Sequence, residues 1–139
     1  MMIVFKVKNN HQDWKKVRKE VFIDEQGFQN EFDLKDYSAL HLTMYIDDEL
    51  VGACRALIED QVGIIGRLAL YPQYRRQGHG KRMVLKMEEL LKSYNVTKMK
   101  LSAQEHAVNF YKSLGYVPYG DQTIDEHVIH QPMEKEVKE

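Results

Sequence analysis

The residues best suited to chemistry lie in one short basic segment with two glycines, Arg75-Arg76-Gln77-Gly78-His79-Gly80-Lys81-Arg82. This segment joins an apolar run that ends at Leu70 to a stretch with helical periodicity. Glycine lets backbone N–H groups approach a ligand closely, and the free N–H groups at a helix start favour an anion. The pattern therefore predicts a pyrophosphate site, with a glycine turn before a solvated basic helix as the alternative. Its spacing fits neither a P-loop nor a three-glycine dinucleotide fingerprint.

The elements that must hold this segment are a strand over 61–70 and a helix that begins within 78–80 and ends near Tyr94. Asn9-Asn10 offers an N-cap for an earlier helix. Residues 25–39 are irregular, with one helical turn expected at most. Further expected elements are strands over 2–7, 41–46, 50–58, 96–101, 116–119 and 126–133, a helix over 107–114 ended by Gly115, and a frayed tail from Met133. This order favours a mixed sheet covered by helices over a regularly alternating parallel fold.

Composition predicts one globular domain that spans residues 1–139, with 43% hydrophobic and 29% charged side chains. Twenty basic and 21 acidic residues give a net charge of −1, which argues against nucleic acid and anionic membranes as partners. The single cysteine, Cys54, has no internal partner, and the N-terminus lacks a signal-peptide core, so we expect a cytoplasmic protein. Its neighbours predict that Cys54 is buried rather than nucleophilic. His127 and His130 face opposite ways if both lie in a strand, so we expect no metal site.

The basic segment resembles the acyl-CoA signature of the GNAT superfamily of N-acetyltransferases, Q/R-x-x-G-x-G/A, at every specified position. It follows Arg67-Leu68-Ala69-Leu70-x-Pro72 and precedes a second family signature over 107–116, at the family's distance. The resemblance covers essentially the whole chain and is nearest to the ElaA-like branch. It implies an α+β fold: a mixed, mostly antiparallel sheet of about seven strands, splayed in the middle, with helices on both faces.

The same resemblance implies where acetyl-CoA binds. Backbone N–H groups over 77–81 would hold the pyrophosphate, with Arg75 and Arg76 beside it. Backbone groups of Leu68 and Leu70 would hold the pantetheine arm, and the Leu68 N–H would act as an oxyanion donor. Gln104 stands where the family often has Asn, so its contact is left open. The residues expected to bind the cosubstrate are Leu68, Leu70, Arg75, Arg76, Gln77, Gly78, His79, Gly80, Lys81, Gln104 and Tyr111.

Transfer of an acetyl group to an amine also needs an acid for the departing thiolate and a base for the ammonium proton. Tyr111 is the expected acid, and its alternative role is to pack in the core as an aromatic residue. Glu25 is the first candidate for the base and His41 the second, ahead of Asp36. The alternative role of Glu25 is that of a solvated or capping carboxylate, and the alternative role of His41 is that of a hydrogen-bonded strand histidine. Arg55 needs a partner if buried: Glu25, an acidic substrate group or a structural carboxylate.

The sequence therefore predicts an acetyl-CoA-dependent N-acetyltransferase that acts by direct attack in a ternary complex. The acceptor is expected to be a primary amine of a small molecule or a protein. A non-catalytic acyl-CoA-binding regulatory module is the alternative. Whether the chain is a monomer or a homodimer is left open.

Overall fold

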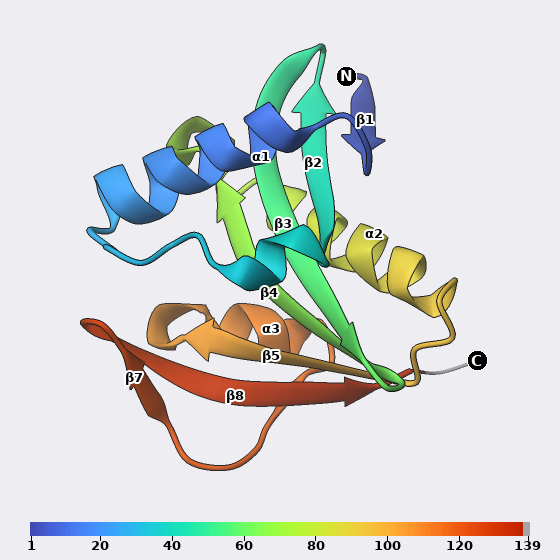
Figure 1. The fold of residues 1–139 in the computed structure, drawn as a ribbon, viewed down its shortest axis with the longest axis vertical. Coiled ribbons are helices and arrows are strands. Elements are labelled where there is room, and N and C mark those ends of the chain that lie inside the picture. The colour runs from blue at the N-terminus through green and yellow to red at the C-terminus, as the bar shows by residue number, and fades with distance from the viewer. Residues whose placement is uncertain (138–139) are drawn as a thin grey trace.

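The computed structural model describes residues 1–137, whose strands form one mixed sheet (Figure 1). The strands in this range are β1 (Ile3–Lys6), β2 (Leu40–Ile46), β3 (Glu49–Glu59), β4 (Val62–Leu70), β5 (Lys98–Gln104), β6 (Val117–Pro118), β7 (Thr123–Asp125) and β8 (Val128–Glu136). Their order is β1-β2-β3-β4-β5-β8-β6, and β7 pairs with β8 outside this path. Among these pairs only β4 and β5 run parallel. The predicted α+β class with a mostly antiparallel sheet is confirmed.

Strand β7 is the one that the sequence pattern misses, since eight strands stand in residues 1–137 against about seven expected. Its three residues are all exposed, so no alternation of buried and exposed positions marks it as a strand. The tail expected to fray from Met133 instead belongs to β8 as far as Glu136. Residues 138 and 139 of that expected tail lie outside the described range.

Helices cover both faces of the sheet (Figure 1). Helix α1 (His11–Arg18) packs Trp14 and Val17 against Ala53, while α2 (His79–Lys92) packs Met83 and Met87 in the core that holds Cys54. Ala53 and Cys54 are consecutive strand residues, so they point to opposite faces. The remaining helical segments are η1 (Lys19–Glu25), which continues α1 as a π-helix, η2 (Leu34–Tyr37), η3 (Pro72–Tyr74), η4 (Glu105–Ala107) and α3 (Val108–Ser113).

The helix boundaries show where local signals hold and where they do not. Gly115 follows α3 with φ 96°, as its expected role in ending that helix requires. Helix α2 ends at Lys92, two residues before the expected Tyr94. Asn10 occupies the N-cap position of α1, but its side chain makes no capping hydrogen bond. Its amide instead donates to the carbonyls of Lys6 and His41 at 3.0 and 3.1 Å, which ties β1 to β2.

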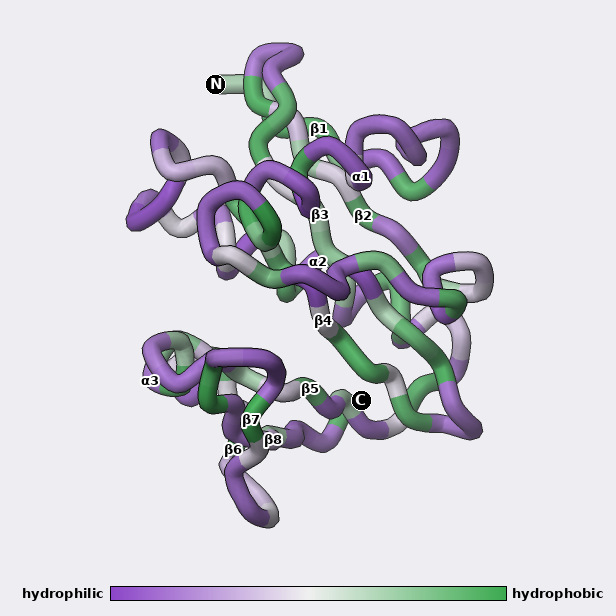
Figure 2. The backbone as a smooth tube through the Cα atoms, turned by 60° about the vertical axis from the view of Figure 1, so that its left-hand side comes forward, coloured by the Kyte–Doolittle hydropathy of each residue, from purple (hydrophilic) through white to green (hydrophobic). Residues whose placement is uncertain are grey.

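The expected splay lies between β4 and β5, which pair only from Val62–Ile65 to Lys98–Leu101. Beyond Ile65 the two strands separate, as both views show (Figures 1 and 2). A β-bulge explains the change of direction: Arg67 and Leu68 of β4 stand opposite the single residue Cys54 of β3. Arg67 has φ 53° there, in the left-handed region. The bulge turns the second half of β4 away from β5 and opens the sheet.

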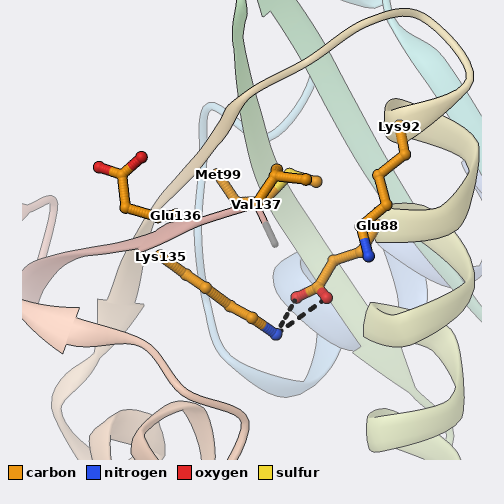
Figure 3. Close-up of a pocket in the computed structure, with 6 residues that line it drawn as sticks. All are labelled: Glu88, Lys92, Met99, Lys135, Glu136 and Val137. Carbon is orange, nitrogen blue, oxygen red and sulfur yellow. Dashed lines mark hydrogen bonds and ion pairs between the residues drawn. The ribbon is translucent and has the colours of Figure 1, made fainter. Parts of the chain in front are cut away.

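On the face of the sheet that α2 covers, the buried carboxylate of Glu88 joins α2 to the C-terminal strand β8 (Figure 3). Glu88 accepts a hydrogen bond of 2.6 Å from the Tyr116 hydroxyl and one of 3.0 Å from the Lys135 ammonium. The hollow beside it measures about 200 Å³ and is also lined by Met99 and Val137. Because both carboxylate oxygens are satisfied, we interpret this cluster as a structural anchor.

Candidate functional site

The splay opens a cavity of about 870 Å³, far larger than the hollow at Glu88. Its lining comes from four parts of the fold: residues 21–31, strands β3 and β4 around the bulge, the basic glycine segment, and the group formed by β5, η4, α3, β7 and β8. The expected cosubstrate residues that line this cavity are Leu68, Leu70, Arg75, Arg76, Gly78, Gly80, Lys81, Gln104 and Tyr111, while Gln77 and His79 are not among its lining residues.

The glycine segment forms the N-terminal end of α2. Gly78 is the N-cap residue with φ 84°, and no side chain caps this end. The first N–H group that bonds within the helix is that of Arg82, which leaves the preceding N–H groups unpaired by the helix. A Cβ on Gly80 would lie 3.3 Å from the Phe110 ring, so glycine permits the close packing of α2 on α3. An uncapped helix start with two cavity-lining glycines suits an anionic ligand.

Some positively charged side chains of this segment form ion pairs with carboxylates, and others do not. Arg75 makes a bidentate ion pair with Glu25, with both N···O distances at 2.7 Å, and its Nε donates to the Leu70 carbonyl. Within residues 1–137, neither Arg76 nor Lys81 takes part in an ion pair. His79 is buried beneath Arg82, and burial followed by the Arg82 charge lowers its pKa. The positive side chains free to meet an anion are those of Arg76 and Lys81.

Strand β4 presents a backbone edge to the cavity after the bulge. Leu68 and Leu70 both line the cavity, and β5 supplies them with no ladder partner because its pairing with β4 stops at Ile65. An extended ligand arm can add to such an edge as a further strand does. This is the position at which the resemblance expects the pantetheine arm.

Tyr111 lies on the cavity wall at 9% exposure, with its ring edge-on to Phe110 and Tyr116. Burial, and after it the nearby Cys54 thiol, raises the pKa of its phenol. In the part of the chain that the structure describes, the hydroxyl has no hydrogen-bond partner. Tyr111 therefore keeps its proton at ordinary pH and has that proton available for a ligand.

The two residues expected to act as the base do not line the cavity. Hydrogen bonding from Arg75 lowers the pKa of Glu25, which makes it a weaker base. His41 stacks on Trp14 with ring centroids 3.8 Å apart, and its Nε2 donates to the Asp36 carbonyl at 2.9 Å. Its Nδ1 is buried without a partner among the described residues, and burial lowers its pKa. The structure does not bring either residue together with Tyr111 and Leu68.

Arg55 pairs with structural carboxylates and not with Glu25. It contacts Asp33 and Asp36 at 2.8 and 3.0 Å, as part of a network that fixes residues 31–36 to the sheet. Arg18 binds Glu31 and Asp36 in the same network, and Arg67 binds Glu31. Burial raises the pKa of Asp36, but hydrogen bonds from Arg18, the Asp33 backbone and Arg55 outweigh it and lower this pKa to about 2. Asp36 is therefore ionised and engaged, which removes it as a candidate base.

A second set of contacts joins residues 26–30 to the C-terminal strands across the cavity. Gln104 donates from Nε2 to Gln26 Oε1 at 2.9 Å, so its side chain has a protein partner. The Glu126 carboxylate accepts hydrogen bonds from the backbone N–H groups of Gln29 and Asn30 at 2.8 and 3.0 Å. His127 lies in the turn before β8 and not in a strand as expected, and its Nε2 donates to the Gln26 carbonyl.

Several polar cavity-lining side chains have no counterpart in the sequence-based site, among them Gln26, Glu31 and His130. Glu31 is 4% exposed, and burial raises its pKa against the effect of Arg18 and Arg67. No local pattern marks these residues, because segments distant in the chain bring them to the cavity. Within residues 1–137 no cluster of three His, Cys, Asp or Glu side chains suits a metal ion. Cys54 is buried as predicted, which raises its pKa to about 12.

The sequence profile of the acetyltransferase (GNAT) domain family matches residues 8–137. The chain belongs to this family. YyaT of Bacillus subtilis (strain 168) is 32% identical over 127 residues, which cover 88% of this chain and 86% of YyaT. ElaA of Escherichia coli (strain K12) is 30% identical over 101 residues, covering 70% of this chain and 66% of ElaA. The expected likeness to ElaA is confirmed.

Two solved structures share the fold of this chain. The crystal structure of Escherichia coli ElaA superposes with a TM-score of 0.85 at 24% identity, covering 96% of this chain and 99% of that one. The PaiA N-acetyltransferase of Thermoplasma acidophilum, solved in complex with coenzyme A, gives a TM-score of 0.70 at 18% identity, covering 99% and 100%. At these identities the likeness establishes the fold. No helix within residues 1–137 is long and apolar enough to cross a membrane.

Proposed function

We propose that this chain is an acetyl-CoA-dependent N-acetyltransferase that acetylates a primary amine of a small molecule or protein by direct attack in a ternary complex. One observation carries the proposal: a single cavity reaches from the uncapped start of α2, along the unpaired edge of β4, to Tyr111 and residues 21–31. A donor and an acceptor can therefore enter from opposite sides of the splayed sheet and meet between β4 and β5.

The chain's own residues divide the work of binding. The N–H groups over 77–81 hold the pyrophosphate with the help of Arg76 and Lys81. The Glu25 carboxylate keeps Arg75 beside this loop, where its Nε also holds the end of β4 through the Leu70 carbonyl. The β4 edge at Leu68 and Leu70 aligns the pantetheine arm by main-chain hydrogen bonds.

The amine nitrogen then attacks the thioester carbon, and the Leu68 N–H stabilises the negative charge that develops on the carbonyl oxygen. The C–N bond forms, the C–S bond breaks, and the Tyr111 hydroxyl gives a proton to the leaving thiolate. A phenol is a weaker acid than a thiol, so this transfer depends on tight positioning in the buried wall.

A free-thiol release assay tests the proposal. Acetyl-CoA is incubated with the protein and with spermidine, glucosamine, free amino acids and peptides with a free N-terminus, and binding of acetyl-CoA is measured by calorimetry. We expect binding together with amine-dependent thiol release for at least one acceptor class. Binding without thiol release would support the regulatory alternative, and absence of binding would contradict the proposal.

A further inference from the structure

The proposed transfer requires a group that takes the proton from the acceptor's ammonium, and neither Glu25 nor His41 lines the cavity. We propose that His130 of β8 is this proton acceptor. The inference rests on the proposed function, because a base is needed only if an amine is acetylated. An aliphatic amine with a pKa of about 10.4 is almost wholly protonated at neutral pH, so its attack depends on such a group.

The fold carries His130 to the acceptor side of the splay. In the sheet it stands opposite Gln104 of β5 and Thr123 of β7, and all three residues line the cavity. Gln104 points toward Gln26 in the 21–31 wall, and cross-strand partners share a face, so His130 lies on that same face. It is half-buried, which leaves part of the imidazole open to the cavity. The cavity joins this position to Leu68 and Tyr111.

A hydrogen bond determines which nitrogen of His130 can accept a proton. Nδ1 lies 3.0 Å from the Val128 carbonyl oxygen. A carbonyl oxygen only accepts, so Nδ1 must carry the hydrogen and the neutral ring keeps its lone pair on Nε2. Among the described residues, Nε2 has no hydrogen-bond partner. The ring is therefore held in the tautomer that a base requires, with its accepting nitrogen unengaged.

The charged groups around His130 are less suited to the role. Asp125 on β7 and His106 in η4 also line the cavity, but both are exposed, as is Glu105 in η4. Across the cavity, Glu31 is engaged by Arg18 and Arg67, and Arg55 is paired with its own carboxylates. In the adjoining turn, Glu126 and His127 are bonded to the backbone of residues 26–30. Asp125 and His106 are open to solvent, whereas His130 is half-buried in the cavity wall, with its tautomer set by the Val128 carbonyl and its Nε2 without a partner among the described residues.

The acceptor's ammonium loses two protons when it becomes an amide. One ammonium proton passes to Nε2, directly or through one water molecule, and frees the nitrogen lone pair for attack. The second nitrogen-bound proton leaves the tetrahedral adduct as the C–S bond breaks, and it replaces the proton that Tyr111 gives to the thiolate. The imidazolium then releases its proton to solvent, so the products are the amide, the CoA thiol and one proton.

The variant His130→Asn tests this assignment, because the Asn amide can still donate to the Val128 carbonyl. On the aliphatic amine found by the thiol release screen, we expect kcat/KM at pH 7 to fall about 10²-fold, the usual scale for a general base. The deficit should shrink as pH rises toward the acceptor's own pKa, because free amine then no longer needs a base. Acetyl-CoA affinity should stay within twofold. His11→Asn, at the exposed start of α1, is the matched control and should behave as wild type.

Other results would contradict either the role of His130 or the proposed function, and the two cases can be told apart. A pH profile identical to wild type, or a loss of equal size at every pH, would overturn the role of His130 while leaving the proposed function intact. If the wild-type protein acetylates no amine, the proposed function fails and this inference falls with it. A measurement without turnover adds a second check: nitrogen-15 NMR of the imidazole should show a protonated Nδ1 in the neutral ring, and a protonated Nε2 would overturn the proposal.

Discussion

Tyr111 differs from the phenylalanines that line the cavity because it carries a hydroxyl, and within residues 1–137 this hydroxyl has no hydrogen-bond partner. Tyr111→Phe keeps the ring and its packing, so stability and acetyl-CoA affinity should be unchanged. The rate of thiol release should fall about 10²-fold, the scale expected for loss of a general acid. Single-turnover kinetics measure this step. A wild-type rate in the variant would leave Tyr111 as a wall residue only.

Glu25 offers the sharpest contrast with His130, because both carry a predicted proton-accepting role but only His130 lines the cavity. Glu25→Gln removes a half-exposed ion pair with Arg75, which contributes about 0–1 kcal/mol. We expect kcat to change less than about threefold, with the shape of its pH profile retained. A large loss of kcat that recovers at high pH would restore Glu25 as the base.

At the residue scale, sequence reasoning finds groups whose function depends on neighbours in the chain. Gly78 and Gly80 act through the loop they belong to, and both line the cavity as the motif predicts. Residue type and nearby sequence favour Glu25 and His41 as bases, but partners far along the chain, Arg75 and Trp14, determine where their side chains point. His130 reaches the cavity only through pairing of β8 with β5, which no local pattern reveals.

The start of α2 allows a test with a matched pair of glycines, because Gly78 and Gly120 both have positive φ, at 84° and 65°. Alanine at either position brings a left-handed strain of about 1–2 kcal/mol, so both variants should lose similar stability. Only Gly78 belongs to the proposed phosphate loop. We expect Gly78→Ala to weaken acetyl-CoA binding at least tenfold by calorimetry and Gly120→Ala to bind normally. Equal affinities in the two variants would remove the loop from the binding site.

At the element scale, the strands and helices with a buried stripe follow from periodicity, and α2 is the clearest example. The features that shape the site do not. The bulge at Arg67 depends on pairing of β4 with β3, and the π-helical continuation over Lys19–Glu25 has no distinct sequence signal. The splay itself was expected only from the resemblance to a known family. Its physical cause is the bulge, together with the early end of the β4–β5 ladder.

At the scale of the whole molecule, the two sides of the splay are joined twice. The first junction is the paired start of β4 and β5. The second is the set of contacts that residues 26–30 make with Gln104 of β5 and with the β7–β8 turn. Phe28 adds a contact with the His127 ring, at 5.0 Å between centroids. The second junction closes the cavity on the side away from the first. How far this end of the splay can open therefore depends on how firmly this turn is held.

Glu126 allows the second junction to be tested, because its carboxylate accepts two backbone hydrogen bonds and these lower its pKa. A carboxyl whose pKa is lower in the folded state than its ordinary value of 4.5 stabilises the folded state at pH values above 4.5. This stabilisation is lost as the pH falls through the lowered pKa. We therefore expect amide exchange at Gln29 and Asn30, corrected for intrinsic rates, to accelerate only when the pH falls below 4.5 and Glu126 takes up a proton. In Glu126→Ala, exchange at these two amides should be at least tenfold faster even at neutral pH, with the melting temperature little changed.

Asp121→Ala, in the exposed loop before β7, is the control. Unchanged protection in Glu126→Ala would mean that residues 26–30 are held by Gln104 and His127 alone.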